Sequence, residues 1–233
     1  MTRRPRVVFT HHDAQAAEEI VDGVITPVYE ATHADVIDDP FYSAVRFVDR
    51  VRGYMKASGF EIVIAEANHE PIGLAFGYVL PSAARWWKGL TTPVEPELIT
   101  ETGRRTFALC ELMVHPEWQG QGVAHALHDE LLDHRPEERA TLLVREDNAA
   151  ARRAYLKWGW QKIGKVRPYD DALTTMRLSS AWKAKAVDDG CPPRPDQRAG
   201  GRVRAARSAR SSSAANGSVS DRIWPGSTRL TSS

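Results

Sequence analysis

The chain has 233 residues, of which 42% are hydrophobic and 26% charged, and its formal net charge at pH 7 is +1. This hydrophobic content is enough for a core, but no apolar run approaches the roughly 20 residues that span a bilayer. The two cysteines, Cys110 and Cys191, provide no disulfide framework, and the basic start has no apolar signal-peptide segment after it. We therefore expect a cytoplasmic protein with no membrane partner.

Hydrophobic periodicity predicts an α/β domain in residues 1–182. Apolar residues recur at three- and four-residue intervals in residues 13–29 and 41–55, which is typical of amphipathic helices. The recurring positions are Ile20, Val24 and Val28, and then Val45, Val48 and Val51. The expected strands are residues 6–10, 60–65, 72–79, 106–114, 140–144, 160–166 and 173–178, and the further helices are residues 123–134 and 148–158.

Residues 183–233 differ in composition from the rest of the chain. They hold ten Lys and Arg against four Asp, about +6 in charge, which leaves the preceding residues at about −5. The segment is rich in Ser, Gly, Pro and Ala, so we expect a disordered basic tail and no second domain. A basic tail can touch nucleic acid nonspecifically, but a solvated extension is the preferred interpretation, and no specific nucleic-acid partner is expected.

A glycine-bearing turn, WQGQGVA at residues 118–124, lies between an expected strand and an expected helix. Gly120 and Gly122 permit positive φ and close approach of a ligand, and the N-terminus of the helix favours an anion. Val123 and Ala124 stand where a P-loop needs Lys and then Ser or Thr, and His125 stands where a dinucleotide fingerprint needs its third glycine. On this segment alone, an ordinary strand-to-helix turn remains an equal alternative.

Two segments in order resemble the GCN5-related N-acetyltransferase (GNAT) family. Gln119, Gly122 and Ala124 match its Q/R-x-x-G-x-G/A signature, and residues 148–160 resemble its N-x-x-A-x-x-x-Y-x-x-x-G-F/W helix. The resemblance spans about residues 60–180 and is most specific in residues 106–166. It implies acetyl-CoA as co-substrate and a single domain with a mixed, mostly antiparallel sheet. It also implies that the sheet is splayed between its fourth and fifth strands.

Acyl transfer to an amine requires groups that move protons. An amine with a pKa near 10.4 is neutral only about once in a few thousand molecules at pH 7, so a base is needed, and the departing thiolate benefits from an acid. Glu111 is the candidate base. Strand alternation places it on the face of Leu109 and Met113, with Ala108, Cys110, Leu112 and Val114 on the other face. The alternative is a structural Glu paired with Arg104 or Arg105.

Tyr155 is the candidate acid. Its spacing from Ala151, Ala154 and Trp158 is that of a core residue on a helix, and periodicity alone predicts packing. In the resembled family, a Tyr seven residues after the Asn directs its hydroxyl to the coenzyme A sulfur. This resemblance implies the acid role for Tyr155.

The same resemblance implies a set of cofactor contacts. Asn148 is expected to contact the pantetheine arm, to cap its helix, or both. The backbone of the strand end should pair with pantetheine amides and the acetyl oxygen, and the glycine turn should hold the pyrophosphate. The residues are Leu112, Met113 and Val114 in the strand, and Gln119, Gly120, Gln121, Gly122, Val123 and Ala124 in the turn.

Substrate choice is expected in two regions. Residues 13–50 hold nine acidic residues against Arg46 and Arg50, and Asp38 and Asp39 lie in the predicted helix-helix loop, where a cationic amine would be attracted. The long segment 81–105 carries Trp86 and Trp87, which can line an acceptor pocket. The alternatives are a solvated acidic surface and a partly disordered loop.

No metal site is predicted. His11 and His12 are adjacent in an expected strand and point to opposite faces, and His125 and His128 lack a further ligand at metal spacing. The sequence thus predicts an acetyl-CoA-dependent N-acetyltransferase, monomeric or homodimeric, that acts on a small-molecule or peptide primary amine. The alternative is a noncatalytic acyl-CoA-binding regulatory module on the same fold.

Overall fold

The computed structural model describes residues 5–166 and 176–180. The strands in these residues form one seven-stranded sheet in the order β1-β2-β3-β4-β5-β7-β6. Strands β4 and β5 run parallel, and the other neighbouring pairs are antiparallel. The strands are β1 Val7–His12, β2 Glu61–Ala67, β3 Glu70–Val79, β4 Thr106–Val114, β5 Arg139–Arg145, β6 Gln161–Val166 and β7 Met176–Ser180. The predicted α/β fold with a mixed, mostly antiparallel sheet is confirmed.

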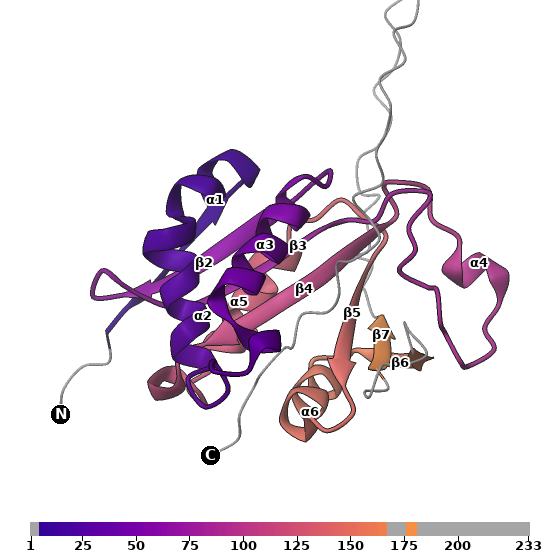
Figure 1. Ribbon diagram of the computed structural model, residues 1–233. Helices are drawn as coiled ribbons and strands as arrows, with labels where there is room; N and C mark the ends of the chain where they lie inside the picture. The colour runs from indigo at the N-terminus through magenta and orange to yellow at the C-terminus, as the bar shows by residue number, and fades with distance from the viewer. Residues whose placement is uncertain (1–4, 167–175, 181–233) are drawn as a thin grey trace, which may run out of the picture.

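Helices pack on both faces of this sheet (Figure 1). One face carries α1 Ala14–Ile20, the π-helical η1 Val21–Ile25, α2 Thr26–Thr32 and α3 Ala44–Met55. The other carries α5 Val123–Leu132, with α6 Ala149–Lys157 beside β5. The shorter helical segments are η2 Pro40–Tyr42, α4 Pro96–Ile99 and η3 Pro116–Trp118. In the part of the chain that the structure describes, no helix has the length and apolar character to cross a bilayer.

The first helices differ from their periodic pattern in detail. The predicted helix 13–29 begins after Asp13, whose Oδ1 accepts from Ala16 N at 2.9 Å, and it contains a π-helical turn. This turn inserts one residue and shifts the buried face to Val21, Ile25 and Val28. Val45 was expected on the buried face of α3, but it is 72% exposed. The prediction is wrong for Val45 but holds for Val51, because α3 packs through Phe47, Val51, Tyr54 and Met55.

Strands β4 and β5 stay paired only near their beginnings. The parallel register runs from Thr106 opposite Arg139 to Leu109 opposite Leu142. Beyond these pairs β4 continues to Val114, whereas β5 continues in register with β7. Figure 1 shows the two strands separating toward their ends, with α6 at the end of β5. The predicted splay between the fourth and fifth strands is confirmed.

A β-bulge lies in β4 where the splay begins. Phe76 faces Glu111 and the next residue, Gly77, faces Leu109, so Cys110 is an extra residue in β4. Cys110 packs with the helices α1 to α3, and so does Met113, whereas Leu109 and Leu112 pack on the α5 side. The predicted alternation, with Glu111 on the face of Leu109 and Cys110 on that of Leu112, is therefore wrong. An extra residue reverses the alternation of every later side chain.

The long connection between β3 and β4 is attached to the sheet by buried polar contacts. Glu101 accepts from Trp87 Nε1 at 2.9 Å, from Thr106 Oγ1 at 2.9 Å and from Arg139 Nη2 at 3.0 Å. A bridge between Leu90 and Val166 ties the same connection to β6. The predicted disordered tail, residues 183–233, and the predicted start of the last strand at residues 173–175 lie outside the described residues.

The close contact at Gly77 generates a stability prediction. A Cβ on Gly77 would lie 2.1 Å from the backbone oxygen of Ala108 and 2.6 Å from the Phe107 ring. Because backbone cannot yield as a side-chain end does, Gly77→Ala should lower the free energy of unfolding by about 1 to 3 kcal/mol. Urea unfolding followed by circular dichroism measures this change.

Gly23 provides the matched control, since nothing lies within 4 Å of a Cβ built there. Gly23→Ala should leave the unfolding free energy unchanged or raise it by up to about 1 kcal/mol. Equal stability of the two variants would contradict the tight β3–β4 approach.

Candidate active site

The glycine turn after β4 adopts the conformation that its sequence predicts. Gly120 has φ of 70° and Gly122 has φ of 87°, and a Cβ built on either meets nothing within 4 Å. Gly122 is the N-cap of α5, and the first helical bond runs from Ala126 N to Gly122 O at 3.0 Å. The N–H groups before Ala126 consequently have no partner within the helix. This end of α5 can receive an anion.

A pocket of about 520 Å³ lies over this turn, between α5 and α6. It is lined by Val114 at the end of β4, by the turn and the first residues of α5, and by one side of α6. The lining residues are Val114, Trp118, Gln119, Gly120, Gly122, Ala124, His125, Ala150, Arg153, Ala154, Lys157 and Trp158. The mixture of glycine backbone, aromatic rings and cations suits a ligand that carries both a ring and phosphate.

Arg153 and Lys157 were missed in the sequence. Both line the pocket, one turn apart on α6, where their charges can reach a phosphate group. Their spacing of four residues was visible in the sequence, but only the packing of α6 beside α5 places them over the glycine turn. Trp158 also lines the pocket, and its ring stacks on that of His125 at 4.9 Å and 17°.

Glu111 lies buried on the face of β4 that α2 and α3 cover. Among the described residues, its ion-pair partner is Arg50 of α3, with Nη2 at 3.9 Å from Oε1, and not Arg104 or Arg105. Within the described residues, its Oε2 has no hydrogen-bond partner. Burial raises the pKa of Glu111 to about 7, and the nearby charge of Arg50 only partly opposes this. A carboxyl group with this pKa can accept a proton near neutral pH.

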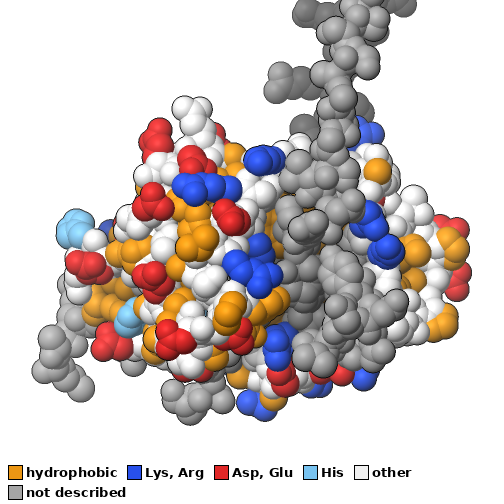
Figure 2. All heavy atoms as spheres, viewed as in Figure 1, with side chains coloured by type: hydrophobic (Ala, Val, Ile, Leu, Met, Phe, Trp, Pro, Cys, Tyr) orange, Lys and Arg blue, Asp and Glu red, His pale blue; other side chains and the backbone are white. Residues whose placement is uncertain are grey.

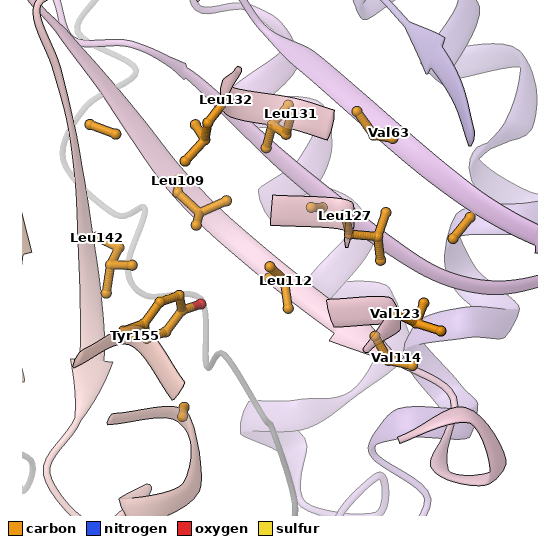
Figure 3. Packing of buried hydrophobic residues seen from close by; sticks show 14 of the residues in the cluster. Val63, Leu109, Leu112, Val114, Val123, Leu127, Leu131, Leu132, Leu142 and Tyr155 are labelled. Carbon is orange, nitrogen blue, oxygen red and sulfur yellow. The ribbon is translucent and has the colours of Figure 1, made fainter. Parts of the chain in front are cut away.

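Tyr155 lies buried on the opposite face of the sheet. It belongs to the hydrophobic cluster on the α5 side and contacts Trp158 and Trp160 edge to face, at ring distances of 5.3 and 5.7 Å. Figure 3 shows its ring between Leu142 of β5 and Leu112 of β4, with the hydroxyl directed toward β4. The hydroxyl therefore points into the interval where the two strands have separated.

The other predicted donor-site residues lie at the end of β4, in the glycine turn and at the starts of α5 and α6. Asn148 caps α6, with Oδ1 accepting from Ala151 N at 3.0 Å. Gln119 donates from Nε2 to Val114 O at 3.0 Å and so ties the glycine turn to the end of β4, while Gln121 donates to Glu117 O at 2.7 Å. Leu112, Met113 and Val114 follow the last β4–β5 pair, and Val123 is buried at the start of α5.

The predicted acceptor residues divide into two groups. Asp38 and Asp39 are exposed, and Asp39 caps η2 by accepting from Phe41 N at 2.8 Å. Trp86 is half-buried and donates to Thr141 Oγ1 of β5 at 3.3 Å. Trp87 is 7% exposed and held by Glu101 and by Arg139, whose Cζ lies 5.2 Å from the ring centroid. The burial of Trp87 argues against contact with an acceptor.

Comparison with known proteins decides the family. The family model described as Acetyltransferase (GNAT) family matches residues 28–160, which contain the glycine turn, Glu111 and Tyr155. The chain belongs to the acetyltransferase (GNAT) family. The predicted acetyltransferase class, with acetyl-CoA as the co-substrate, is thus confirmed.

Solved structures support the fold at low sequence identity. The chain resembles a putative acetyltransferase of the GNAT family from Desulfovibrio desulfuricans with a TM-score of 0.52 and 15% identity, covering 76% of this chain and 98% of that one. It resembles PH1933 from Pyrococcus horikoshii OT3 with a TM-score of 0.52 and 17% identity, covering 75% and 97%. No curated protein matches this chain.

The cations of this acetyltransferase's pocket generate a binding prediction. If Arg153 and Lys157 contact phosphate groups of coenzyme A, the double variant Arg153→Gln/Lys157→Gln should raise its Kd about five-fold. Each exposed ion pair contributes about 0.2–1 kcal/mol, and the loss should shrink as salt is added. Isothermal titration calorimetry at two ionic strengths measures both effects.

Lys162→Gln is the control, because Lys162 is an exposed cation of β6 that does not line the pocket. Its Kd for coenzyme A should equal that of the unaltered protein. An equal loss in the control and the double variant would mean that only the net charge matters.

Proposed function

We propose that the protein is an N-acetyltransferase that transfers the acetyl group of acetyl-CoA to a primary amine by direct attack in a ternary complex. The observation that carries this proposal is the placement of Glu111 and Tyr155. Glu111 lies in β4 beyond its last pair with β5 and faces α3, whereas Tyr155 lies on the other face of the sheet with its hydroxyl directed toward β4. One face therefore offers a proton acceptor and the other a proton donor.

Glu111 serves as the general base. The amine nitrogen forms a bond to the thioester carbonyl carbon, and the proton that it loses passes to the carboxylate, directly or through a water. Three features support this role: burial, a pKa raised to about 7, and an Oε2 without a partner among the described residues. Arg50 at 3.9 Å is too far for a hydrogen bond and leaves the carboxylate able to accept a proton.

Tyr155 serves as the general acid. As the carbon–sulfur bond breaks, the phenol gives its proton to the departing thiolate. The orientation of its hydroxyl toward β4 supports this role, as does the position of α6 beside the donor pocket. The edge-to-face contacts with Trp158 and Trp160 hold the ring in place.

The glycine turn and the strand end bind the donor. The N–H groups at the start of α5 hold the pyrophosphate, and the backbone of residues 112–114 pairs with the pantetheine amides and with the acetyl oxygen. Separation of β5 from this part of β4 supports the pairing, since an extended ligand can occupy the place of a neighbouring strand. Asn148 contributes a contact to the pantetheine arm in addition to capping α6.

The acceptor enters on the face of α1 to α3. Figure 2 shows acidic side chains over the surface of these helices, with some Lys and Arg among them, and the exposed Asp38 and Asp39 contribute to the acidic charge. A cationic amine is attracted to such a surface. Trp86, half-buried against β5, supplies an aromatic wall, whereas the buried Trp87 serves to anchor the connection before β4.

Glu111→Gln tests the base. It should lower kcat by about 100-fold or more, which is the usual contribution of a positioned base. In the unaltered enzyme, kcat should rise with pH and level off above a pKa near 7, because only the deprotonated carboxylate accepts a proton and burial raises its pKa to about 7. This limb should be absent from the variant. Detection of thiol release between pH 5.5 and 9 gives both results.

A matched control is Glu66→Gln, on β2, which is separated from β4 by β3 and lies outside the opening. Its pH profile should be unchanged. A loss of ten-fold or less in Glu111→Gln, with the pH limb unmoved, would remove Glu111 from the mechanism.

Tyr155→Phe tests the acid. The change keeps the ring and its packing but deletes the proton, so kcat should fall by about 10- to 100-fold while coenzyme A affinity stays constant. Tyr78→Phe, a change at a half-buried tyrosine of β3, is the control and should keep full kcat. Full turnover by Tyr155→Phe would assign Tyr155 to packing alone.

A screen of amine acceptors tests the reaction class. After coenzyme A binding is established, thiol release from acetyl-CoA is followed with small amines, polyamines, aminoglycosides and peptides. Release that depends on one class of amine supports the proposal and identifies the acceptor. Binding of coenzyme A without release on any acceptor would support the noncatalytic module instead.

A further inference from the structure

Three metal-binding side chains converge where β1, β2 and the end of α5 meet. His11 of β1 places Nδ1 2.7 Å from Oε1 of Glu61 in β2, and His134, just after α5, places Nε2 3.3 Å from the same oxygen. The three ligand atoms all lie within 4.8 Å of one another. The two imidazole rings meet edge to face at 5.0 Å.

The surrounding side chains hold these groups as a metal site requires. The second nitrogen of His11, Nε2, lies 3.1 Å from Oε1 of Glu130. Histidines that bind metals usually donate their other N–H to a carboxylate in this way. The second oxygen of Glu61 accepts from Arg135 Nη1 at 2.7 Å, which orients the first oxygen toward the histidines. Arg135 is itself neutralised by two hydrogen bonds to Glu137, at 2.9 and 2.7 Å.

The chemistry of this set favours zinc. Two imidazoles and one carboxylate are a common ligand set for Zn²⁺, with bonds of about 2.0 to 2.2 Å that place tetrahedral ligands about 3.4 Å apart. Small rotations of the two exposed histidines would reach this spacing. Their side chains are 32% and 53% exposed, so solvent can supply the fourth ligand. We propose that His11, Glu61 and His134 bind one Zn²⁺ ion.

A second group of possible ligands, His125, His128 and Asp129, does not fit as well. His128 Nε2 accepts from Trp160 Nε1 at 2.9 Å, so the ring proton is on Nδ1, which lies 2.8 Å from Asp129 Oδ1. Both nitrogens of His128 are thus engaged, and its side chain is only 12% exposed. To bind a metal ion through Nδ1, His11 in contrast needs to lose only the Nδ1 proton. It keeps the hydrogen bond from Nε2 to Glu130.

The zinc would act on stability and not on acyl transfer. Helix α5 begins at the glycine turn and ends two residues before His134, so about 15 Å of helix separates the ion from the donor site. The ion would join the edge strand β1 and its neighbour β2 to the end of this helix. An ion that binds the folded chain but not the unfolded chain raises the thermal stability of the protein.

Zinc titration of the full chain tests the site. The chain is freed of any affinity tag, treated with chelator and titrated with ZnSO₄ by calorimetry, and Co²⁺ is used to record the visible absorption of a tetrahedral ion. We expect one tight ion per chain and a higher Tm with zinc. His11→Gln and His134→Gln should each weaken binding at least ten-fold, and Glu130→Gln about 10- to 100-fold through the orientation of His11.

Two histidine variants are the controls. His12→Gln, on the adjacent position of β1, and His125→Gln, on α5, should bind zinc as the unaltered chain does and show the same rise in Tm. His134 is exposed, so His134→Gln should fold normally, with an unchanged circular dichroism spectrum. Absence of stoichiometric zinc binding would overturn the proposal. Full binding by His134→Gln, or loss in His125→Gln alone, would overturn it as well.

Discussion

The separation of β4 from β5 is the constraint on which the rest of this molecule depends. Pairing ends at Leu109 and Leu142, and the bulge at Cys110 lies at the same point. Past it, one edge of β4 no longer pairs with β5, and a side chain on either face of the sheet can approach this edge. Beside the bulge, β3 approaches β4 closely, which Gly77 permits because it has no Cβ.

A buried carboxylate is the clearest departure from ordinary packing in this core. Glu111 lies among Met113, Cys110 and the helices α2 and α3, where an apolar residue would stabilise the fold more. Arg50 is close enough to lower the pKa of Glu111 but does not form a hydrogen bond with it. Departures of this kind are expected at functional sites, where a group must stay available for chemistry.

The two faces of the sheet differ in charge. This difference would suit two ligands of opposite charge, an anionic phosphate-bearing donor and a cationic amine. The donor side presents the N-terminus of α5 together with Arg153 and Lys157, which suit phosphate groups. The other face carries residues 13–50, which hold nine acidic residues against two Arg and so would suit an amine. The connection before β4, held by Trp87 and Glu101, packs beside β5 and carries Trp86 to this second face.

The sequence by itself determined the elements, the glycine turn and the family, because these depend on short-range patterns: apolar periodicity, positive-φ glycines and two motifs. It could not determine which way Glu111 points, because one bulged residue reverses a strand's alternation and leaves no mark in composition. Nor could it bring Arg50 to Glu111, or His11 to Glu61 and His134, since these partners are distant in the chain. Only the packing of helices on a twisted sheet sets such contacts, and so the tertiary structure alone decided the surroundings of Glu111 and the histidine cluster.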